Sequence, residues 1–597
     1  MSEYRAPIRD MMFVLTELAG LDEVAALPPF ADVNAELVQQ ILEENGKFAT
    51  EVLSPLNQPG DRQGSKWTAD GVKTPDGFGD AYRKFVDGGW NALQFPTDFG
   101  GQGLPKTVAT PVMEMWKSAN LSFSLCPLLT GGVIEALLLR GSDAQKAQYL
   151  PKMIQGDWTG TMNLTEPQAG SDLALIKSRA VPEGDHYRIF GQKIFITYGE
   201  HDLAENIVHL VLARAQDAPA GVRGISLFIV PKFLVNADGS LGARNDVRCV
   251  SLEHKLGIHA SPTAVMQYGE RDGAIGTLIG EENRGLEYMF IMMNAARFAV
   301  GMEGVAISER AYQRAVDYAR DRIQSRELGG SGSQSVAIIK HPDVRRMLMT
   351  MRAQTEATRA LAYVVAAATD KAHHHPDENE RKRQQAFVDL MIPIVKGWST
   401  EVGIEIASTG VQVHGGMGFI EETGAAQHLR DARITTIYEG TTGIQANDLI
   451  GRKLSRDGGQ TAKAVISQLK ALDGELAKHS DLQLAAIRKR LAAAAVAADE
   501  CITWIVNGAG QDVRAAYAGA VPFLKLMGIT TAGWQMARAA VIAQKRLTAG
   551  GPDASFYQAK ITTARFFADH FLSQVPGLRD QVVQGAASVL GLAEEQF

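Results

Sequence analysis

Cysteine is scarce in this 597-residue sequence. The chain has three cysteines, Cys126, Cys249 and Cys501, which lie far apart and form no CxxC pair. We therefore expect neither a disulfide framework nor a metal site built on cysteine, and the pattern is typical of a protein from a reducing compartment.

An excess of basic residues is also missing. The chain carries 60 Lys and Arg against 67 Asp and Glu, which gives a net charge of −7. The last segment, residues 456–597, has 15 basic and 12 acidic residues. Proteins that bind nucleic acid through their surface carry a clear basic patch or stripe, so we expect no nucleic-acid partner.

Long uninterrupted apolar runs are also missing from the sequence. The N-terminal region has one apolar run of five residues (11–15), and the richest stretch, 491–498, is mostly alanine. A membrane span needs about 18 apolar residues, and a secretory signal needs a longer apolar core with a cleavage site. We expect a cytoplasmic protein with no membrane insertion.

Several common catalytic motifs are missing as well. The sequence has no GxGxxG after a predicted strand, and no GxxxxGK[ST], HExxH or GxSxG. The sequence therefore gives no motif for a Rossmann dehydrogenase, a P-loop ATPase, a zinc protease or an α/β hydrolase. Three adjacent histidines (373–375) precede a polar PDENE stretch and are predicted to lie in a solvated loop, so no metal site is expected.

The pattern of apolar residues divides the chain into five parts. Residues 1–35 form an N-terminal extension, and residues 36–158 show helical spacing. Residues 159–280 contain short runs rich in β-branched residues, which predict an antiparallel sheet domain. Helical spacing returns over 281–455, and a segment at 455–460 is predicted to be a linker. The extension 456–597 is predicted to be helical, with one apolar stripe made of Leu484, Ile487, Leu491, Ala495, Ala498 and Ile502.

Two glycine-containing loops can bind a ligand or can simply be turns. In LTEPQAGSDL (164–173), Gly170 and Ser171 could present N–H groups and a hydroxyl to an anion or a flavin edge. The alternative is a β-turn in which Ser171 or Asp172 caps a short helix, and composition alone favours this turn. In HGGMGF (414–419), the Gly-Gly pair allows close approach to a phosphate or an unusual turn between helices.

A single glutamate is a candidate general base. In RDARITTIYEGTTGIQ (430–445), Glu439 lies between Tyr438 and Gly440, so its carboxylate could sit in a tight turn that faces a pocket. Shielding from water would raise its pKa and suit it to proton abstraction. A surface turn glutamate is the alternative, and it is favoured when this segment is considered alone.

Taken together, five motifs resemble those of the acyl-CoA dehydrogenase family, in the same order and at similar separations. They are LTEPQAGSDL, GQKIFITYG (191–199), ARDRIQ (319–324), QVHGGMGF (412–419) and RDARITTIYEGTTGIQ. The resemblance covers residues 40–455. It implies an α+β multidomain fold: an N-terminal helical domain, a middle antiparallel β-domain and a four-helix domain, here with an extra C-terminal helical domain.

The resemblance also implies a cofactor and roles for particular residues. FAD is the implied cofactor, Glu439 falls on the catalytic base of the family's YEGT motif, and Ser171, His259 and Gly440 fall near the substrate. Phe195 takes the place of a ring-stacking tryptophan, His259 that of an arginine, and His341 that of a glutamine. The positions that match FAD contacts are Met162, Leu164, Thr165, Gly170, Ser171, Phe195, Thr197, Arg322, Gln324, Gln412, Gly415, Gly416 and Thr441.

The implied activity is α,β-dehydrogenation of an acyl-CoA thioester. Segment 4–18 and the C-terminal extension resemble the large-subunit branch that acts on 3-methylmercaptopropionyl-CoA in dimethylsulfoniopropionate breakdown. A short-, medium- or long-chain fatty acyl-CoA dehydrogenase is the alternative, as is an acyl-CoA oxidase. A DNA-binding flavoprotein of the alkylation-response branch is an alternative from a different class. The implied partners are an electron-transfer flavoprotein and further copies of the chain, as a homodimer or a dimer of dimers.

Overall fold

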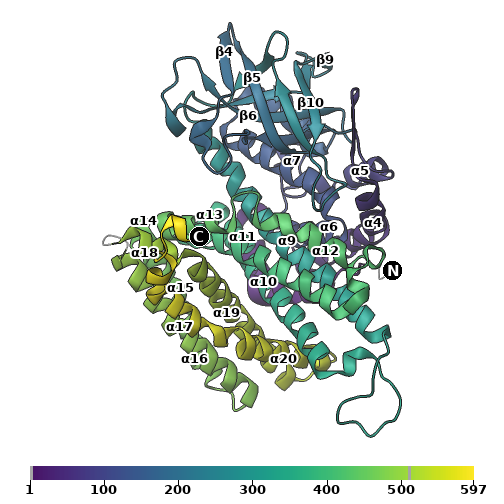
Figure 1. Cartoon of the computed structure of the whole chain (residues 1–597), viewed down its shortest axis with the longest axis vertical. Helices are drawn as coiled ribbons and strands as arrows, with labels where there is room; N and C mark the ends of the chain where they lie inside the picture. The colour runs from purple at the N-terminus through teal and green to yellow at the C-terminus, as the bar shows by residue number, and fades with distance from the viewer. Residues whose placement is uncertain (1–3, 509–511) are drawn as a thin grey trace. The chain divides into compact units, whose positions relative to one another are not determined.

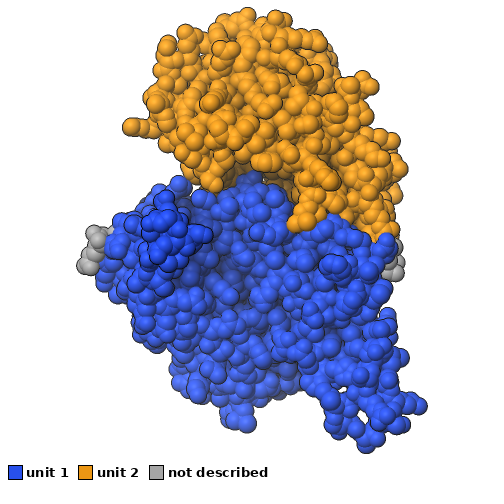
Figure 2. All heavy atoms as spheres, in the orientation of Figure 1, with its two compact units in different colours: residues 1–46, 105–118, 300–597 blue, residues 47–104, 119–299 orange. Residues whose placement is uncertain are grey.

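The computed structural model describes residues 4–508 and 512–597. These residues form two compact units, coloured separately in Figure 2. Unit 1 comprises Met1–Gly46, Pro105–Ser118 and Val300–Phe597, and unit 2 comprises Lys47–Leu104 and Ala119–Ala299. The chain thus enters unit 1 three times, and the predicted helical domain 36–158 contributes residues to both units.

Unit 1 is helical, and two of its long helices, α10 and α11, pack side by side (Figure 1). Helices α19 and α20 of the C-terminal extension pack on each other and on α10. The helices that lie wholly or partly in unit 1 are α1 (Ile8–Phe13), α2 (Leu21–Ala25), α3 (Ala35–Phe48), α6 (Lys106–Ala119), α9 (Gly285–Asp321), α10 (Pro342–His374), α11 (Glu378–His414), α12 (Ala425–Ala432), α13 (Thr442–Asp448), α14 (Ser455–Asp457), α15 (Gln460–Ala471), α16 (Asp473–Leu476), α17 (Leu482–Gly508), α18 (Val513–Ala518), α19 (Ala520–Ala549), α20 (Ala554–His570), α21 (Val575–Gln584) and α22 (Ala586–Val589).

The C-terminal extension is part of unit 1 because its apolar faces pack against the other helices. All six residues of the predicted stripe on α17 are buried, as the helical period requires. The predicted linker at 455–460 is a short break between helices, where Gly458 and Gly459 adopt φ values of 62° and 78°. The Asp457 carboxylate accepts from the backbone N–H groups of Gly459 and Thr461 at 2.9 and 2.8 Å. This segment therefore joins two helices of one unit.

Unit 2 contains the sheet, and most of its strand pairs are antiparallel. The order is β10-β11-β5-β12-β7-β6-β3, with β4 paired to β5 and β6. Helix α7 packs on β3. The helices that lie wholly in this unit are α4 (Ser54–Gln63), α5 (Phe78–Asp87), α7 (Leu121–Arg140) and α8 (Asp143–Gln155), and the strands are β1 (Lys66–Thr68), β2 (Gly71–Lys73), β3 (Trp158–Asn163), β4 (Arg179–Glu183), β5 (His186–Thr197), β6 (Asn206–Ala215), β7 (Ser226–Pro231), β8 (Phe233–Val235), β9 (Leu241–Arg244), β10 (Val247–Leu252), β11 (Thr263–Tyr268) and β12 (Ala274–Leu278).

The strands differ from the sequence prediction in three details. β3–β6 and β4–β6 are parallel, because the chain passes through the β4–β5 hairpin before it returns as β6. The β-branched runs HYRIF (186–190) and KIFIT (193–197), which the sequence predicts as separate strands, form one strand, β5, with Gly191 at φ 142° at its middle. A hairpin, β1–β2, interrupts the region predicted as helical: its turn residues are Ala69 and Asp70, and Thr68 pairs with Gly71 across it.

Three helices are long and apolar enough to cross a membrane by length and composition. They are α7, α9 and α17, so the expectation that no such stretch exists was wrong. In α7 the apolar character is explained by burial, since 78% of its most apolar window lies inside the structure. An apolar helix that is buried on all sides is the ordinary core helix of a large domain.

The three cysteines are free and buried. Burial raises the pKa of the Cys249 and Cys501 thiols to about 12, and it raises that of Cys126 as well. All three side chains are therefore neutral thiols at physiological pH.

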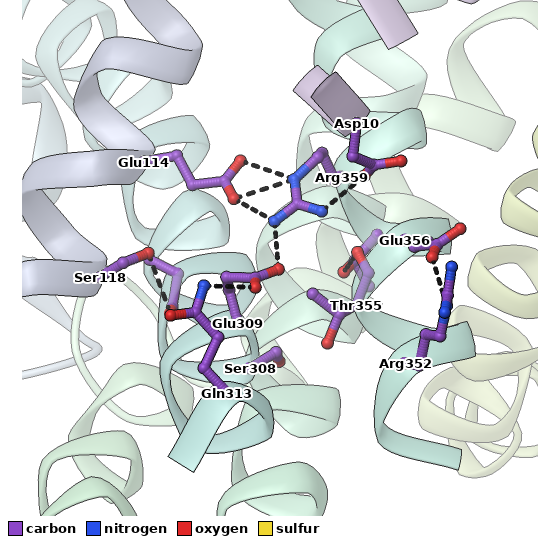
Figure 3. A network of polar contacts seen from close by, with 12 residues as sticks. Asp10, Glu114, Ser118, Ser308, Glu309, Gln313, Arg352, Thr355, Glu356 and Arg359 are labelled. Atoms are coloured by element: carbon purple, nitrogen blue, oxygen red, sulfur yellow. Dashed lines mark hydrogen bonds and ion pairs between the residues drawn. The ribbon is translucent and has the colours of Figure 1, made fainter. Parts of the chain in front are cut away.

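A buried ionic cluster connects five helices of unit 1, and Figure 3 shows the part of it around Arg359. The Arg359 guanidinium on α10 donates to Glu114 on α6 and to Glu309 on α9, each at 2.6 Å, and to Asp10 on α1 at 2.7 Å. Lys560 on α20 contacts Asp10 and also donates to Glu356 at 2.9 Å. Burial alone would raise the pKa of Asp10, but Lys560 and Arg359 lower it to about 2. The N-terminal segment and the C-terminal extension are thereby bonded to the same cluster.

We expect Arg359→Met to lower the free energy of unfolding by about 3–5 kcal/mol, because three carboxylates lose their shared buried cation. Thermal and denaturant unfolding midpoints measure this. Arg383→Met is the matched control, since Arg383 makes an exposed ion pair with Glu380 and its loss costs about 0–1 kcal/mol. Equal effects of the two substitutions would show that the cluster contributes little to stability.

Two buried histidines make unit 2 sensitive to acid. His201 Nε2 lies 2.9 Å from Thr159 Oγ1, and His209 Nδ1 lies 2.7 Å from Thr161 Oγ1. Burial, with Lys232 nearby, lowers the pKa of each histidine from 6.5 to about 3. The unfolded chain therefore binds more protons than the folded chain below pH 6.5, and stability is lost progressively as the pH falls toward 3.

We expect the denaturant midpoint of unit 2 to fall between pH 7 and pH 5, a range above the pKa of ordinary carboxylates. The double variant His201→Asn/His209→Asn should show a smaller fall over the same range, because it has lost both groups that take up protons only when unfolded. Intrinsic fluorescence during urea titration at each pH measures the midpoints. An unchanged pH slope in the double variant would contradict this assignment.

Candidate active site

The segment around Glu439 is a strained turn between two helical elements of unit 1. A 3₁₀ turn (Arg433–Thr436) precedes it and α13 follows it. Glu439 has φ 56° and Gly440 has φ 88°, so two successive residues adopt the left-handed conformation. Glycine takes this conformation without steric cost, whereas a glutamate does so only when its surroundings hold it there. Thr441 begins α13 by accepting from the Ile444 N–H at 3.2 Å through its hydroxyl.

Buried side chains hold the carbonyl groups of this turn. Gln445 Nε2 donates to the carbonyl oxygens of Glu439 and Gly440 at 3.1 and 3.0 Å. Lys396 Nζ donates to the Gly440 carbonyl oxygen at 2.7 Å. Position 440 favours glycine because its φ of 88° is rarely adopted by residues with a side chain, and a Cβ there would also lie 2.8 Å from Gln445 Nε2 and displace that donor. Three residues of the YEGT motif thus have a local structural role. Glu439 adopts a strained conformation, Gly440 supplies a left-handed turn, and Thr441 caps α13.

The residue before Glu439 is bonded to a second buried group. The Tyr438 hydroxyl donates to the Glu303 carboxylate on α9. Lys117 on α6 donates to the same carboxylate at 3.2 Å, and both of these charged side chains are fully buried. Burial raises the pKa of Glu303 and lowers that of Lys117, while their mutual attraction opposes both shifts.

Sequence reasoning missed these supporting residues. Lys117, Glu303 and Lys396 each interrupt an apolar helical stretch, which is the one signal that could have found them. Their partners lie about 40 to 190 positions away in the chain, beyond the reach of any local pattern.

Three other residues of unit 1 that the sequence singled out lie at the ends of α9 and α10 and on the loop between them. Arg322 and Gln324 follow α9, where Ile338 N–H donates to the Arg322 carbonyl oxygen at 2.8 Å and Gln324 N–H to that of Val336 at 3.0 Å. These bonds close the loop that contains the GGSGS segment, residues 329–333. His341 Nε2 contacts the Gln324 carbonyl oxygen at 2.7 Å, so this histidine holds the same loop.

The glycine pair at the end of α11 leaves open space. Gly415 has φ 60°, and a Cβ at Gly415 or Gly416 would meet no atom within 4 Å. Such a bare backbone fits the approach of a phosphate. Gln412 is exposed one turn earlier, and a cavity of about 480 Å³ lies close by, lined in part by Tyr318 and His414.

In unit 2, the predicted flavin loop begins at the end of β3. Met162 lies in the strand and is buried, while Leu164 and Thr165 are half-buried. The Lys193 ammonium donates to the Leu164 carbonyl oxygen at 3.0 Å and to Glu166 at 2.8 Å. Burial would raise the pKa of Glu166, but Lys193 and several hydrogen bonds lower it to about 2. The loop is therefore anchored by a buried ion pair.

The tip of this loop and the end of β5 are open to solvent. Gly170 and Ser171 are exposed, and Asp172, not Ser171, caps the short helix Leu173–Leu175 by accepting from Ala174 N–H at 3.0 Å. Phe195 has φ 60° and is 58% exposed, while Thr197 is half-buried. The Ile194 N–H donates to the Thr165 carbonyl oxygen at 2.9 Å, so the end of β5 is bonded to the start of this loop. An exposed aromatic ring on strained backbone at this place fits a flat ring system.

His259, the residue in the arginine position, is held within unit 2. Its Nδ1 lies 3.1 Å from the Asp61 carboxylate, and its Nε2 lies 2.9 Å from the Lys255 carbonyl oxygen. It lines a cavity of about 270 Å³ together with Arg62, Ser261 and other residues. Of the predicted substrate contacts, Ser171 and His259 belong to unit 2 and Gly440 belongs to unit 1.

Comparisons with known proteins cover nearly the whole chain. Models of the acyl-CoA dehydrogenase N-terminal, middle and C-terminal domains match residues 36–157, 161–269 and 283–454. A model described as acetyl-CoA dehydrogenase C-terminal like matches residues 461–593. The 3-methylmercaptopropionyl-CoA dehydrogenase of Ruegeria pomeroyi is 53% identical over 98% of this chain and 99% of its own length.

Two solved structures share the fold at low sequence identity. ACDH-11 of Caenorhabditis elegans, in complex with C11-CoA, aligns with a TM-score of 0.76 at 20% identity over 98% of this chain and 97% of its own. An acyl-CoA dehydrogenase of Bacillus anthracis, complexed with FAD, aligns with a TM-score of 0.75 at 22% identity over 96% and 92%. The predicted fold class is confirmed by these matches.

Proposed function

Because the chain belongs to the acyl-CoA dehydrogenase family, we propose that Glu439 is the base that removes the α proton of an acyl-CoA thioester. The enzyme is an FAD-dependent acyl-CoA dehydrogenase, as the sequence predicted. One observation supports the role of Glu439 above the others: it is a glutamate held in left-handed backbone by buried donors to its own carbonyl group and that of its neighbour.

The chain's own residues account for the proton and for the charge that its loss creates. The Glu439 carboxylate takes the proton from the α carbon, and negative charge develops on the thioester oxygen. A backbone N–H of the turn, that of Glu439, stabilises this charge as a fixed donor that needs no reorganisation. FAD, when bound, accepts the β hydrogen as a hydride.

The residues present fit FAD. In unit 1, Gly415 and Gly416 offer bare backbone, and the exposed guanidinium of Arg322 suits a pyrophosphate. In unit 2, Phe195 offers an exposed ring and Ser171 a hydroxyl. We also assign cofactor contacts to Met162, Leu164, Thr165, Gly170, Thr197, Gln324, Gln412 and Thr441, at the positions that the family motifs indicate.

For the substrate we propose 3-methylmercaptopropionyl-CoA, which is oxidised to 3-methylthioacryloyl-CoA. The support is the identity of 53%, over nearly the full length, to a relative named for that substrate. Ser171, Gly440 and His259 are the proposed residues near the substrate. A fatty acyl-CoA of short, medium or long chain is the alternative.

The partners follow from the same family relationship. We propose that an electron-transfer flavoprotein reoxidises the enzyme, that the chain works as a homodimer or a dimer of dimers, and that it acts in the cytoplasm. The exposed apolar side chains at Met417, Phe419 and Ile420, next to the glycine pair, agree with a surface that another copy covers.

We expect Glu439→Gln to keep bound FAD and to lose dehydrogenation by about 10²–10⁴-fold, because an amide cannot accept the α proton. Anaerobic bleaching of the flavin by acyl-CoA measures the step directly. Glu401→Gln is the matched control, since Glu401 is an exposed carboxylate that accepts from Thr442, two residues after the base turn. Turnover of Glu439→Gln within a few-fold of wild type would remove Glu439 as the base.

The second prediction concerns the acyl group. We expect kcat/KM to be highest for 3-methylmercaptopropionyl-CoA, with pentanoyl-CoA about 10–200-fold lower, because an apolar pocket separates near-isosteres by only about 1–3 kcal/mol. Butyryl-CoA should react measurably and palmitoyl-CoA poorly. A preference for chains of twelve carbons or more would assign the enzyme to fatty-acid oxidation. Hydrogen peroxide released in step with turnover would identify an oxidase.

A further inference from the structure

Three charged side chains that the mechanism does not use lie fully buried behind the base turn. Lys117 and Glu303 form an ion pair at 3.2 Å, and Lys396 donates to the Gly440 carbonyl oxygen. Each comes from a different helix, respectively α6, α9 and α11. Burying a charge costs several kcal/mol unless partners compensate it, and well-packed apolar residues serve as well or better for stability alone. The stability of the fold therefore does not explain why three charged side chains are buried here.

The bonds of this group end on the residues that flank Glu439. On the N-terminal side, the Tyr438 hydroxyl is bonded to Glu303. On the C-terminal side, the Gly440 carbonyl oxygen accepts from Lys396 and from Gln445. The residues on both sides of Glu439 are thus fixed to buried groups of α9, α11 and α13: Tyr438 through its side-chain hydroxyl and Gly440 through its carbonyl oxygen.

We propose that Tyr438, Glu303, Lys117 and Lys396 are positioning residues, which hold Glu439 in its left-handed conformation and so fix the direction of its carboxylate. The proposal rests on the proposed role of Glu439 as the base. Lys117 acts through Glu303, since it neutralises the carboxylate that receives the Tyr438 hydroxyl. Lys396 acts through the Gly440 carbonyl group.

The physical reason is the cost of the left-handed conformation at a residue with a side chain. A non-glycine residue pays about 1–3 kcal/mol there, so the turn relaxes unless its neighbours hold it. Relaxation would rotate the Glu439 side chain away from the α carbon of the substrate. A misplacement of about 1 Å lowers the rate of such a step by up to about 10²-fold.

Tyr438→Phe is the first test, because it removes one hydroxyl and leaves the Lys117–Glu303 pair in place. We expect the anaerobic rate of flavin reduction to fall about tenfold or more, with KM changed less than about threefold, since the substrate still binds. Tyr363→Phe is the matched control: its hydroxyl donates to the buried Glu114 carboxylate at 2.7 Å, in the Arg359 cluster. It should cost similar stability and leave the rate of flavin reduction unchanged.

A pair of double variants separates the hydrogen bond from the buried charges. Lys117→Met/Glu303→Gln keeps an acceptor for the Tyr438 hydroxyl, whereas Lys117→Met/Glu303→Leu removes it, and both remove the ion pair. We expect the first to react within about threefold of wild type and the second to match Tyr438→Phe. Equal rates in the two double variants, both near wild type, would overturn the role of Glu303.

A readout that needs no turnover follows the turn itself. Hydrogen–deuterium exchange of a peptide covering residues 437–446 should speed up by about tenfold in Tyr438→Phe and in Lys396→Met, and not in Tyr363→Phe. Unchanged exchange and unchanged rates in the first two variants would overturn the proposal. If these variants were unaffected while Glu439→Gln was inactive, only the positioning role would fail. Activity of Glu439→Gln would instead remove the proposed base.

Discussion

The guanidinium of Arg359, enclosed by three carboxylates, is the interaction on which the architecture of unit 1 depends. It donates hydrogen bonds to Glu114, Glu309 and Asp10 on three other helices, and Asp10 also contacts Lys560 of the C-terminal extension. If one of these helices failed to pack, a buried charge of the cluster would lose its partner, which is strongly destabilising. These helices must therefore assemble together. The N-terminal segment and the C-terminal extension are for this reason parts of one body, whatever their distance in sequence.

Buried charges act in the same way at a smaller scale behind Glu439, the proposed base. There Glu303, which pairs with Lys117, is bonded to Tyr438, and Lys396 is bonded to the Gly440 carbonyl oxygen. These bonds hold the residues that flank Glu439. The first cluster joins helices, whereas the second restricts a single residue. A catalytic carboxylate gains from such restriction, because only a base that already points at its proton avoids the cost of orienting it.

The sequence predicted those features that depend on a period or a motif. The apolar stripe of α17 followed from helical spacing, and the strands β6 and β7 followed from β-branched runs. The candidate base followed from the order of five motifs. The parallel β3–β6 pair could not be predicted, since a period of two gives the face of a strand and not the direction of its neighbour. Lys117 and Lys396 were missed because the role of a charged residue in an apolar helix depends on its bonding partner, and here the partners lie far away in the sequence.

The burial of the cysteines bears on how the enzyme survives its own chemistry. An α,β-unsaturated thioester, the product that we propose, is an electrophile that alkylates thiolates at its β carbon. Cys126, Cys249 and Cys501 are buried, and their raised pKa values keep them as neutral thiols. Since the thiolate is the reactive form, none of the three offers a nucleophile to the released product.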